Sequence, residues 1–474
     1  MAMRRWIGTW ACGWALLVTA ASGQNAGPAD ASPSSGESAP TAIRFVDGLT
    51  MDADDRVVLE RFIGHAVVYA RGLTQEQVLA RCREAPEMFA WVEFRHLNCL
   101  NVAYQLTGDT QYLDLLRDGF ALFRAIMTTG PDEYLGWYGK PIEPRRLKDQ
   151  PDLQIDELQM NFRAISLLAG WVELARSNEG YAARNAETVR AYVELMEKHL
   201  FPKWDARGHF AEIPGRGGVY YGLDYPIPTK VTLSHEKLSI MVDGLLRLHR
   251  VTGRDVYLRR ALQVGAWFKS NLALKEDHYE WMSWAPAGKW DVHPDKPDAW
   301  RVGWIAPDPN GPWYVTSLSI ALNLYQHGLL FTDADLERFV KTQKTMCWNG
   351  DLERPEYRTV AGATGKWIKG RFLSYQVAHY DPVLRRLAFD GPHEAEQLKG
   401  SSSSWAGGAN AQDYICEKFL MAPRVAKHPK PYASVGERFL ADKGNKDFYD
   451  GLFFEVTAPG AATPRTPREM FGRE

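Results

Sequence analysis

Polar side chains that transfer protons or bind carboxylates recur at one point of a repeating pattern in this sequence. They occur in five segments, at residues 91–98, 156–163, 234–237, 310–314 and 371–381. Tyrosine, histidine and the acidic residues transfer protons, whereas arginine binds carboxylates. In each segment the polar residues open or directly flank an apolar stretch. Shared chemistry therefore requires the fold to bring these distant segments to one place.

Helices explain the repetition. We expect apolar helices near residues 90–106, 156–176, 236–251, 314–328, 371–380 and 409–421. More amphipathic partner helices are expected near residues 110–127, 183–200, 255–272 and 333–346. A helix that is apolar on all sides lies inside a fold, and a one-sided helix covers it. The pattern predicts an all-α protein, an (α/α)6-like toroid of helical hairpins with long aromatic loops.

Matching turns mark the hairpins. Gly108 and Gly253 each follow a threonine and each precede a Tyr-Leu pair four residues later. A Thr-Gly turn predicts a helix that ends on a left-handed glycine. A looser copy places a helix stop at Gly328, with Thr332 or Asp333 capping the next helix.

With these hairpins and turns, residues 52–422 resemble the toroid carbohydrate-active enzymes. This group includes alginate and glucuronan lyases, unsaturated glucuronyl hydrolases and acylglucosamine epimerases. The Asn-Asn-His signature of the classical alginate lyases is not found in the sequence. The resemblance implies a central cleft surrounded by the first turns of the inner helices. It also implies a polysaccharide lyase acting on a uronic-acid-containing glycan.

β-Elimination of a uronate glycan needs a cation or donor at the C6 carboxylate, a base for the C5 proton and an acid for the departing O4. The lyases that the chain resembles use tyrosine as acid or as both acid and base. The resemblance therefore implies Tyr314, after a Gly-Pro turn, as the catalytic tyrosine. It implies Asn161 and His235 as carboxylate neutraliser or base, with Arg163 and Arg371 as reinforcements.

Carboxylates support a second hypothesis. Asp156 and Glu157 lead one predicted helix, and Glu236 and Asp243 lie on another. An inverting glycoside hydrolase, similar to the unsaturated glucuronyl hydrolases, uses two carboxyl groups roughly 6.5–9.5 Å apart. Acidic residues in a first helical turn also interact favourably with the helix dipole, which is a purely structural role. A toroid that binds glycan without catalysis is a third hypothesis.

Aromatic residues indicate a sugar ligand. Five tryptophans, Trp281, Trp284, Trp290, Trp300 and Trp304, fall within one loop-rich stretch. A flat indole face matches the C–H face of a pyranose and commonly lines concave sites. The residues predicted to bind substrate are Trp91, His96, Trp284, Trp313, Tyr375 and His379.

No metal or cofactor is expected. The stretch with Asp291, His293, Asp295 and Asp298 is rich in oxygen ligands that could hold Ca²⁺ or Zn²⁺, but its spacing matches no ligand motif. Phosphate-binding, dinucleotide-binding and nucleophile-elbow motifs are not found.

The start of the chain predicts export, because Arg4 and Arg5 precede an apolar run that ends in small residues. We expect a signal peptide at residues 1–24, a flexible linker at 25–43 and the catalytic toroid at 44–425. Residues 426–474 are expected to form an extension that packs on the toroid or frays from it. The predicted location is secreted or periplasmic, without membrane association after signal cleavage.

The bulk composition bounds the partners. The 474 residues carry a net charge of −2, which gives no support for nucleic-acid binding, so the expected partner is an acidic polysaccharide or oligosaccharide. Outside the signal peptide, Cys82, Cys99, Cys347 and Cys416 contain no C-x-x-C pair, so a zinc site is not predicted. One or two disulfides, or buried free thiols, are both compatible with the sequence.

Overall fold

The computed structural model describes residues 43–142, 152–226, 230–302, 311–358, 368–369, 372, 374–390, 409–456 and 466–472, except for the side chains of residues 311–315, 368–369 and 409–410. The chain divides into two units, residues 1–44 and 45–474, and the fold described below is that of the second unit.

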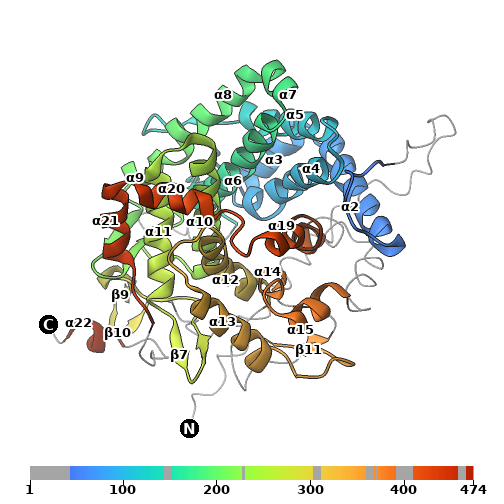
Figure 1. The fold of residues 1–474 in the computed structure, drawn as a ribbon. Helices are drawn as coiled ribbons and strands as arrows, with labels where there is room; N and C mark the ends of the chain where they lie inside the picture. Colours follow the sequence, from blue (N-terminus) through green and yellow to red (C-terminus); the bar gives the residue numbers. More distant parts are fainter. Residues whose placement is uncertain are drawn as a thin grey trace, which may run out of the picture. The chain divides into compact units, whose positions relative to one another are not determined.

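Helices dominate this unit, as the sequence predicts (Figure 1). The apolar segments form α4 (Phe94–Thr107), α6 (Leu158–Arg176), α10 (His235–Thr252), α12 (Gly311–Gln326), α14 (Tyr375–Ala378) and α18 (Ala409–Ile415). The amphipathic partners form α5 (Gln111–Ala125), α8 (Ala186–Leu195), α11 (Asp255–Lys269) and α13 (Asp333–Lys341). Of the predicted apolar helices, only α14 is much shorter than expected.

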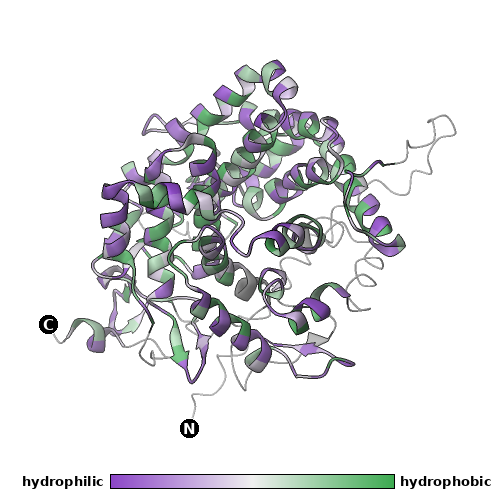
Figure 2. Cartoon of the chain, viewed as in Figure 1, coloured by the Kyte–Doolittle hydropathy of each residue, from purple (hydrophilic) through white to green (hydrophobic). Residues whose placement is uncertain are grey.

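Burial separates the two kinds of helix. Buried residues lie on every side of α6, whereas α5 buries one stripe that includes Leu113, Leu116, Phe120 and Phe123. That spacing of three and four residues is expected of a helix that covers a core. Figure 2 shows hydrophilic and hydrophobic residues alternating along helices near the rim of the view, such as α8 and α21 (Lys443–Leu452).

The inner helices contact one another in order. Helix α4 contacts α6, α6 contacts α10, α10 contacts α12, and α12 contacts α14. The π-helical turn η8 (Cys416–Met421) continues α18 and contacts α14, and α18 contacts α4. The partner helices pack on this set, with α5 on α4, α8 on α6 and α11 on α10 (Figure 1).

The helix ends follow the predicted turns. Gly108, Gly253 and Gly328 all have positive φ angles, of 70°, 71° and 69°, so the three left-handed glycines are confirmed. Thr332 is the residue that caps α13, because its hydroxyl accepts a hydrogen bond from the backbone N–H of Asp335.

Shorter elements complete the unit. The remaining α-helices are α2 (Ala53–Gly72), α3 (Gln75–Glu84), α7 (Glu179–Arg184), α9 (Pro202–Ala206), α15 (Pro382–Arg385), α19 (Ala422–Lys427), α20 (Ala433–Ala441) and α22 (Pro467–Phe471). Further single turns are η1 (Phe89–Glu93), η3 (Met196–Leu200), η4 (Lys289–Asp291), η5 (Thr342–Met346) and η7 (Arg386–Asp390).

The strands of the described residues form two-stranded antiparallel pairs only. These pairs are β1 (Thr128–Thr129) with β2 (Leu135–Gly136), β3 (Asp156–Glu157) with β6 (Asp224–Tyr225), β4 (Phe210–Ile213) with β5 (Gly217–Tyr220), β7 (Ala273–Lys275) with β8 (His278–Glu280), β9 (Val292–His293) with β10 (Lys296–Trp300), and β11 (Glu356–Tyr357) with β12 (Ile368–Lys369). The β3–β6 pair bears on function, because β3 leads directly into α6.

The tryptophan-rich stretch is organised by Asp291. Its completely buried carboxylate accepts hydrogen bonds from the backbone and side chain of Thr232, and from the backbone N–H groups of Ala287 and Gly288. Trp284 donates its indole N–H to the carbonyl of Thr232 at 2.7 Å. Asp291 therefore fastens this stretch to the residues just before α10.

The C-terminal residues 433–452 pack against the helices. Helix α21 contacts α11, where Arg259 donates to Asn445 at 2.8 Å. The hydroxyl of Tyr449 accepts from the backbone N–H of Leu330 at 3.0 Å. This part of the predicted extension therefore belongs to the compact unit.

All four cysteines of the unit are free thiols, so no disulfide joins them. No helix among the described residues is both long enough and apolar enough to span a bilayer.

The docking of α20 predicts a destabilising substitution. A Cβ atom at Gly436 would lie 2.2 Å from the carbonyl oxygen of His327, so Gly436→Ala forces the two segments apart. We expect the free energy of unfolding to fall by about 1–3 kcal/mol, as for other overpacked sites. Chemical denaturation measures the change. Gly451→Ala on α21 is the control, since its Cβ would meet nothing within 4 Å, and equal stabilities of the two variants would contradict the packing of α20.

Candidate functional site

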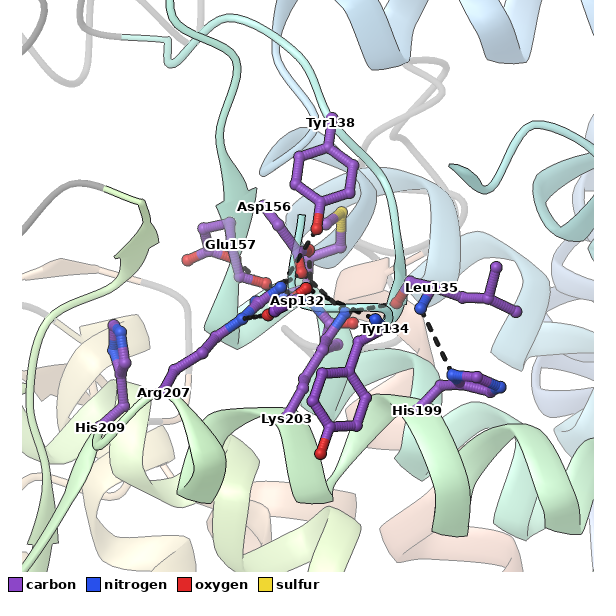
Figure 3. Close-up of polar contacts among 12 residues, drawn as sticks. Asp132, Tyr134, Leu135, Tyr138, Asp156, Glu157, His199, Lys203, Arg207 and His209 are labelled. Carbon is purple, nitrogen blue, oxygen red and sulfur yellow. Dashed lines mark hydrogen bonds and ion pairs between the residues drawn. The ribbon is translucent and has the colours of Figure 1, made fainter. Parts of the chain in front are cut away.

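A completely buried carboxylate, Asp156, lies at the entrance to α6 (Figure 3). It accepts from Lys203 Nζ at 2.7 Å, from Arg207 Nη1 at 2.8 Å and from Asn161 Nδ2 at 2.8 Å. Lys203 and Arg207 are four residues apart at α9, so both side chains leave the helix on the same face. A buried charge is stable only when it is paired, and two cations with one amide satisfy Asp156.

Arg207 extends this cluster to a neighbouring loop. Its guanidinium binds Asp132 at 2.6 Å and the Tyr138 hydroxyl at 3.1 Å (Figure 3). The Cζ atom of Arg207 also lies 3.9 Å from the centre of the Tyr225 ring. Lys203 also donates to the carbonyl of Leu135 at 2.8 Å. The cluster thus fixes the loop that contains Asp132 and Tyr138, the strand β3 and the start of α6 to one another.

Burial and charge act in opposite directions on Lys203. Burial lowers the pKa of its amine to about 8, although Asp156 favours the charged form. The side chain is fully enclosed and all its observed partners are protein groups. Its role in the described structure is therefore to anchor Asp156.

Glu157, the next residue of β3, faces a different environment. It is buried, caps α6 by accepting from the Met160 N–H at 2.6 Å, and pairs across the strands with Asp224. Burial first, and then the charge of Asp224, raises the pKa of Glu157 well above its usual value. Glu87 raises this pKa further, whereas Lys237 lowers it. A buried carboxyl group whose pKa is raised in this way is suited to act as a general acid.

A second polar region runs along the inner helices. Residues spaced three or four apart keep partial exposure while their neighbours are buried; they are Arg95 and Asn98 on α4, Arg163 on α6, Asp243 and Arg247 on α10, and Ser319 and Asn323 on α12. The side chains of Asp243 and Arg247 are 28% and 32% exposed and pair at 3.0 Å. Ser166 on α6 donates to Asp243, which joins the two helices. We call this set the inner polar stripes.

Arg163 is the least satisfied cation of the inner polar stripes. Burial first, and then the charge of Arg95, lowers the pKa of Arg163 to about 10, although Asp243 and Asp413 favour its charged form. Its Nε atom is buried and has no hydrogen-bond partner. Arg247 also lowers this pKa. A partly exposed guanidinium with an unused Nε–H donor can form a charge-assisted hydrogen bond with a carboxylate ligand.

Two predicted catalytic residues, Asn161 and His235, are completely buried in the structure. The Nδ2 group of Asn161 donates to Asp156 and to the carbonyl of Glu157, so both its hydrogens are used. His235 is completely buried, with its ring 5.1 Å from the ring of Phe268 and with both ring nitrogens unpartnered. Burial lowers the pKa of His235 to about 3, which keeps the ring neutral.

Most of the predicted substrate-binding side chains are engaged within the protein, and Tyr375 and His379 both stack on Phe389. Trp284 is completely buried and Tyr375 is buried against Phe389 and Tyr414, so neither presents an open ring face. Trp91 and His96 are half-buried, whereas the side chain of His379 is completely buried. His96 Nδ1 pairs with the Val92 carbonyl and its ring stacks on Tyr69, while His379 pairs with Glu417 at 2.8 Å.

Three predicted site residues have side chains that lie outside the described residues. Trp313 and Tyr314 are in the first turn of α12, at the same end of an inner helix as Glu157, but their side chains lie outside the described residues. Arg371 also lies outside them. Within the described part of the chain, no group of three or more His, Cys, Asp or Glu residues could hold a metal ion.

The structure adds residues that sequence reasoning did not select. Asp224 lies on β6, and its pairing with Glu157 depends on contact between segments 67 positions apart. The only signal for Lys203 and Arg207 in the sequence is their spacing of four residues, which is common on exposed helices. Asp243 and Arg247 have the same spacing, and their helix was predicted to be an inner one, so that combination was a usable signal.

No protein-family model matches the chain, and no curated protein matches it significantly. The geometry of the two polar regions is therefore the basis on which a function is proposed.

Loss of the Asp156 charge should destabilise the fold. Asp156→Asn keeps the shape but leaves Lys203 and Arg207 buried without their shared counter-charge, so unfolding should become easier by about 3–5 kcal/mol. The control is Asp205→Asn, because Asp205 pairs with Arg260 at the surface with 36% of its side chain exposed and is expected to contribute less than about 1 kcal/mol. Urea denaturation measures the free energy of unfolding of both variants. Losses of similar size in the two variants would contradict a special role for Asp156.

The buried histidine predicts acid sensitivity. Because the pKa of His235 is about 3 in the folded protein and 6.5 in the unfolded chain, the unfolded state binds more protons between these values. Stability should therefore fall as the pH decreases below 6.5, by about 1.4 kcal/mol per pH unit from this residue. Stability curves of His235→Leu should lose that part of the slope, while His428→Leu, at an exposed position, should keep it. Parallel curves for all three proteins would contradict the buried neutral ring.

Proposed function

We propose that the protein is an exported polysaccharide lyase of the α/α toroid type that cleaves a uronic-acid-containing glycan by β-elimination. The observation that carries this proposal is Arg163, a cation on an inner helix with an unused donor and with Arg95 and Arg247 near it. A glycan rich in carboxylates is the chemical class that such a site would select. The predicted signal peptide accounts for the proposed secreted or periplasmic location.

The order of helix contacts supports a toroid. Contacts run from α4 through α6, α10, α12 and α14 to η8, and α18 returns to α4. Partner helices cover the outside of α4, α6 and α10. In such a ring the inner polar stripes would line the interior, and the first turns of α6, α10 and α12 would lie at one end.

The proposed roles combine the unused donor of Arg163 with the tyrosine and the arginine that the sequence indicates. Arg163 binds the C6 carboxylate, which makes the C5 proton more acidic. Tyr314, in the first turn of α12, is proposed to transfer protons, with Arg371 as a further carboxylate ligand. Neither Asn161 nor His235 has a role in this proposal, because the amide hydrogens of Asn161 are used within the protein and His235 is completely buried.

Substitution of Arg163 tests the proposal. A lyase product carries a C4–C5 double bond conjugated with the carboxylate, so cleavage of glucuronan or alginate is followed by ultraviolet absorbance. Arg163→Gln should lower kcat/KM by about 10²–10³-fold, because a group that stabilises transition-state charge is lost. Arg190→Gln, an exposed arginine on α8, should retain wild-type activity. An Arg163→Gln variant with undiminished activity would remove this residue from the mechanism.

A glycoside hydrolase is the second candidate, and the Glu157–Asp224 pair is the observation that favours it. Their positions face each other on β3 and β6, where opposite Cβ atoms are about 4.5–5.5 Å apart. Glu157, with its raised pKa, would protonate the glycosidic oxygen, and Asp224 would act as the ionised partner. Asp156, proposed from sequence as one of the pair, is instead bound by Lys203 and Arg207.

The two candidates differ in product and in sensitive residue. A hydrolase releases reducing ends without ultraviolet absorbance, and Glu157→Gln should then lower kcat by about 10²–10⁴-fold and remove the basic limb of the pH–rate profile. Circular dichroism controls for folding, since Gln retains the cap on α6. Unsaturated products with an unaffected Glu157→Gln variant would exclude the hydrolase.

A further inference from the structure

The inner polar stripes have a definite depth. Arg163 lies five residues after the start of α6, and Glu173 lies ten residues beyond Arg163 on the same helix. At 1.5 Å per residue these positions are about 7 Å and about 22 Å from the helix start. Ser319 and Asn323 on α12 extend to similar depths and remain partly exposed. The polar lining therefore continues along α12 to about 18 Å from the helix start, about 10 Å deeper than Arg163.

Residues 421–432, which we call the closing segment, bind the far ends of the inner helices. Arg424 donates to Gln105 in the last turn of α4 at 3.3 Å and to the Tyr432 hydroxyl at 3.1 Å. The backbone N–H of Tyr432 donates to the carbonyl of Gln326, the last residue of α12, at 3.0 Å. The closing segment thus joins the ends of two inner helices that are not neighbours in the contact order.

Tyr432 connects the closing segment to α6 and α10, the two inner helices that come between α4 and α12 in the contact order. Its ring stacks on His327 with centroids 4.9 Å apart, and the Arg250 guanidinium lies 5.0 Å from its centre. Arg250, near the end of α10, makes two hydrogen bonds to Glu173 of α6, at 3.1 and 3.0 Å. The carboxyl-terminal ends of α4, α6, α10 and α12 are therefore all tied to Tyr432, directly or through one residue.

We infer that the glycan site is blind-ended, closed by the closing segment, so that the enzyme accepts the end of a chain and acts exolytically. The inference rests on the proposed toroid and on its uronate substrate. With one end closed, ligand enters only past the first turns of the inner helices. Such a site is neither a tunnel nor an open groove, so a long polymer cannot pass through it.

The occupant is a terminal segment of an acidic oligosaccharide. Its carboxylate pairs with Arg163, and the sugar units beyond lie against hydroxyl and amide groups such as Ser319 and Asn323. Each turnover removes the C5 proton, forms the C4–C5 double bond, breaks the C4–O4 bond and returns a proton to O4. The short product, whether or not it carries the double bond, leaves by the same opening.

The test compares viscosity with bond cleavage during digestion of a soluble uronate polymer by the wild-type protein. We expect viscosity to fall only in proportion to the bonds cut, and chromatography to show short products from the first time point. A steep early loss of viscosity, with a ladder of intermediate sizes, would overturn the inference. Reducing-end release replaces absorbance as the measure of cleavage if the enzyme proves to be a hydrolase, so the inference is judged separately from the lyase chemistry.

Binding stoichiometry gives a second measurement, independent of turnover. Calorimetric titration of the Tyr314→Phe variant with uronate chains of increasing length should give the same number of proteins bound per chain. A number that grows with chain length indicates an open groove and overturns the blind end. Absence of both cleavage and binding with all uronate glycans refutes the proposed function, and this inference with it.

Discussion

Burial of the Asp156 carboxylate is the interaction on which the geometry of the candidate site depends. A charge with no access to water requires partners, and Lys203, Arg207 and Asn161 supply them from α9 and from the first turn of α6. Because β3 continues directly into α6, these partners fix where the helix starts and how it is rotated. The orientation of Glu157, of Arg163 and of the groups further along α6 follows from that one constraint.

The charged residues divide into two kinds. Arg207 is enclosed between two carboxylates, a hydroxyl and an aromatic ring, so its bonding capacity is used within the protein. Arg163 has neighbouring cations, a lowered pKa and a buried Nε without a partner. The first kind holds elements together, whereas the second leaves favourable electrostatic interactions for a ligand to complete. The proposed function depends on this difference more than on any residue type.

The sequence predicts the helices well, because apolar periodicity and Thr-Gly turns are local signals, and it predicts Gly108, Gly253 and Gly328 as left-handed. It fails on the direction of side chains. The sequence prediction puts Asn161 and Arg163 at one site. Residues two apart on a helix are rotated by about 200° about its axis, however, so their side chains lie on nearly opposite faces. The amide of Asn161 donates a hydrogen bond to Asp156, and His235 packs against Phe268 in the interior. The Glu157–Asp224 pair requires contact between distant segments, which composition and spacing do not encode.

The central claim is that an acidic sugar binds between the inner helices with its carboxylate on Arg163. A crystal structure of the Tyr314→Phe variant soaked with a uronate oligosaccharide tests this most directly. The account predicts a C6 carboxylate within hydrogen-bond distance of the Arg163 guanidinium, with the sugar chain ending short of Tyr432. A glycan bound elsewhere, or one that extends past Tyr432 through the far end of the helices, would contradict it.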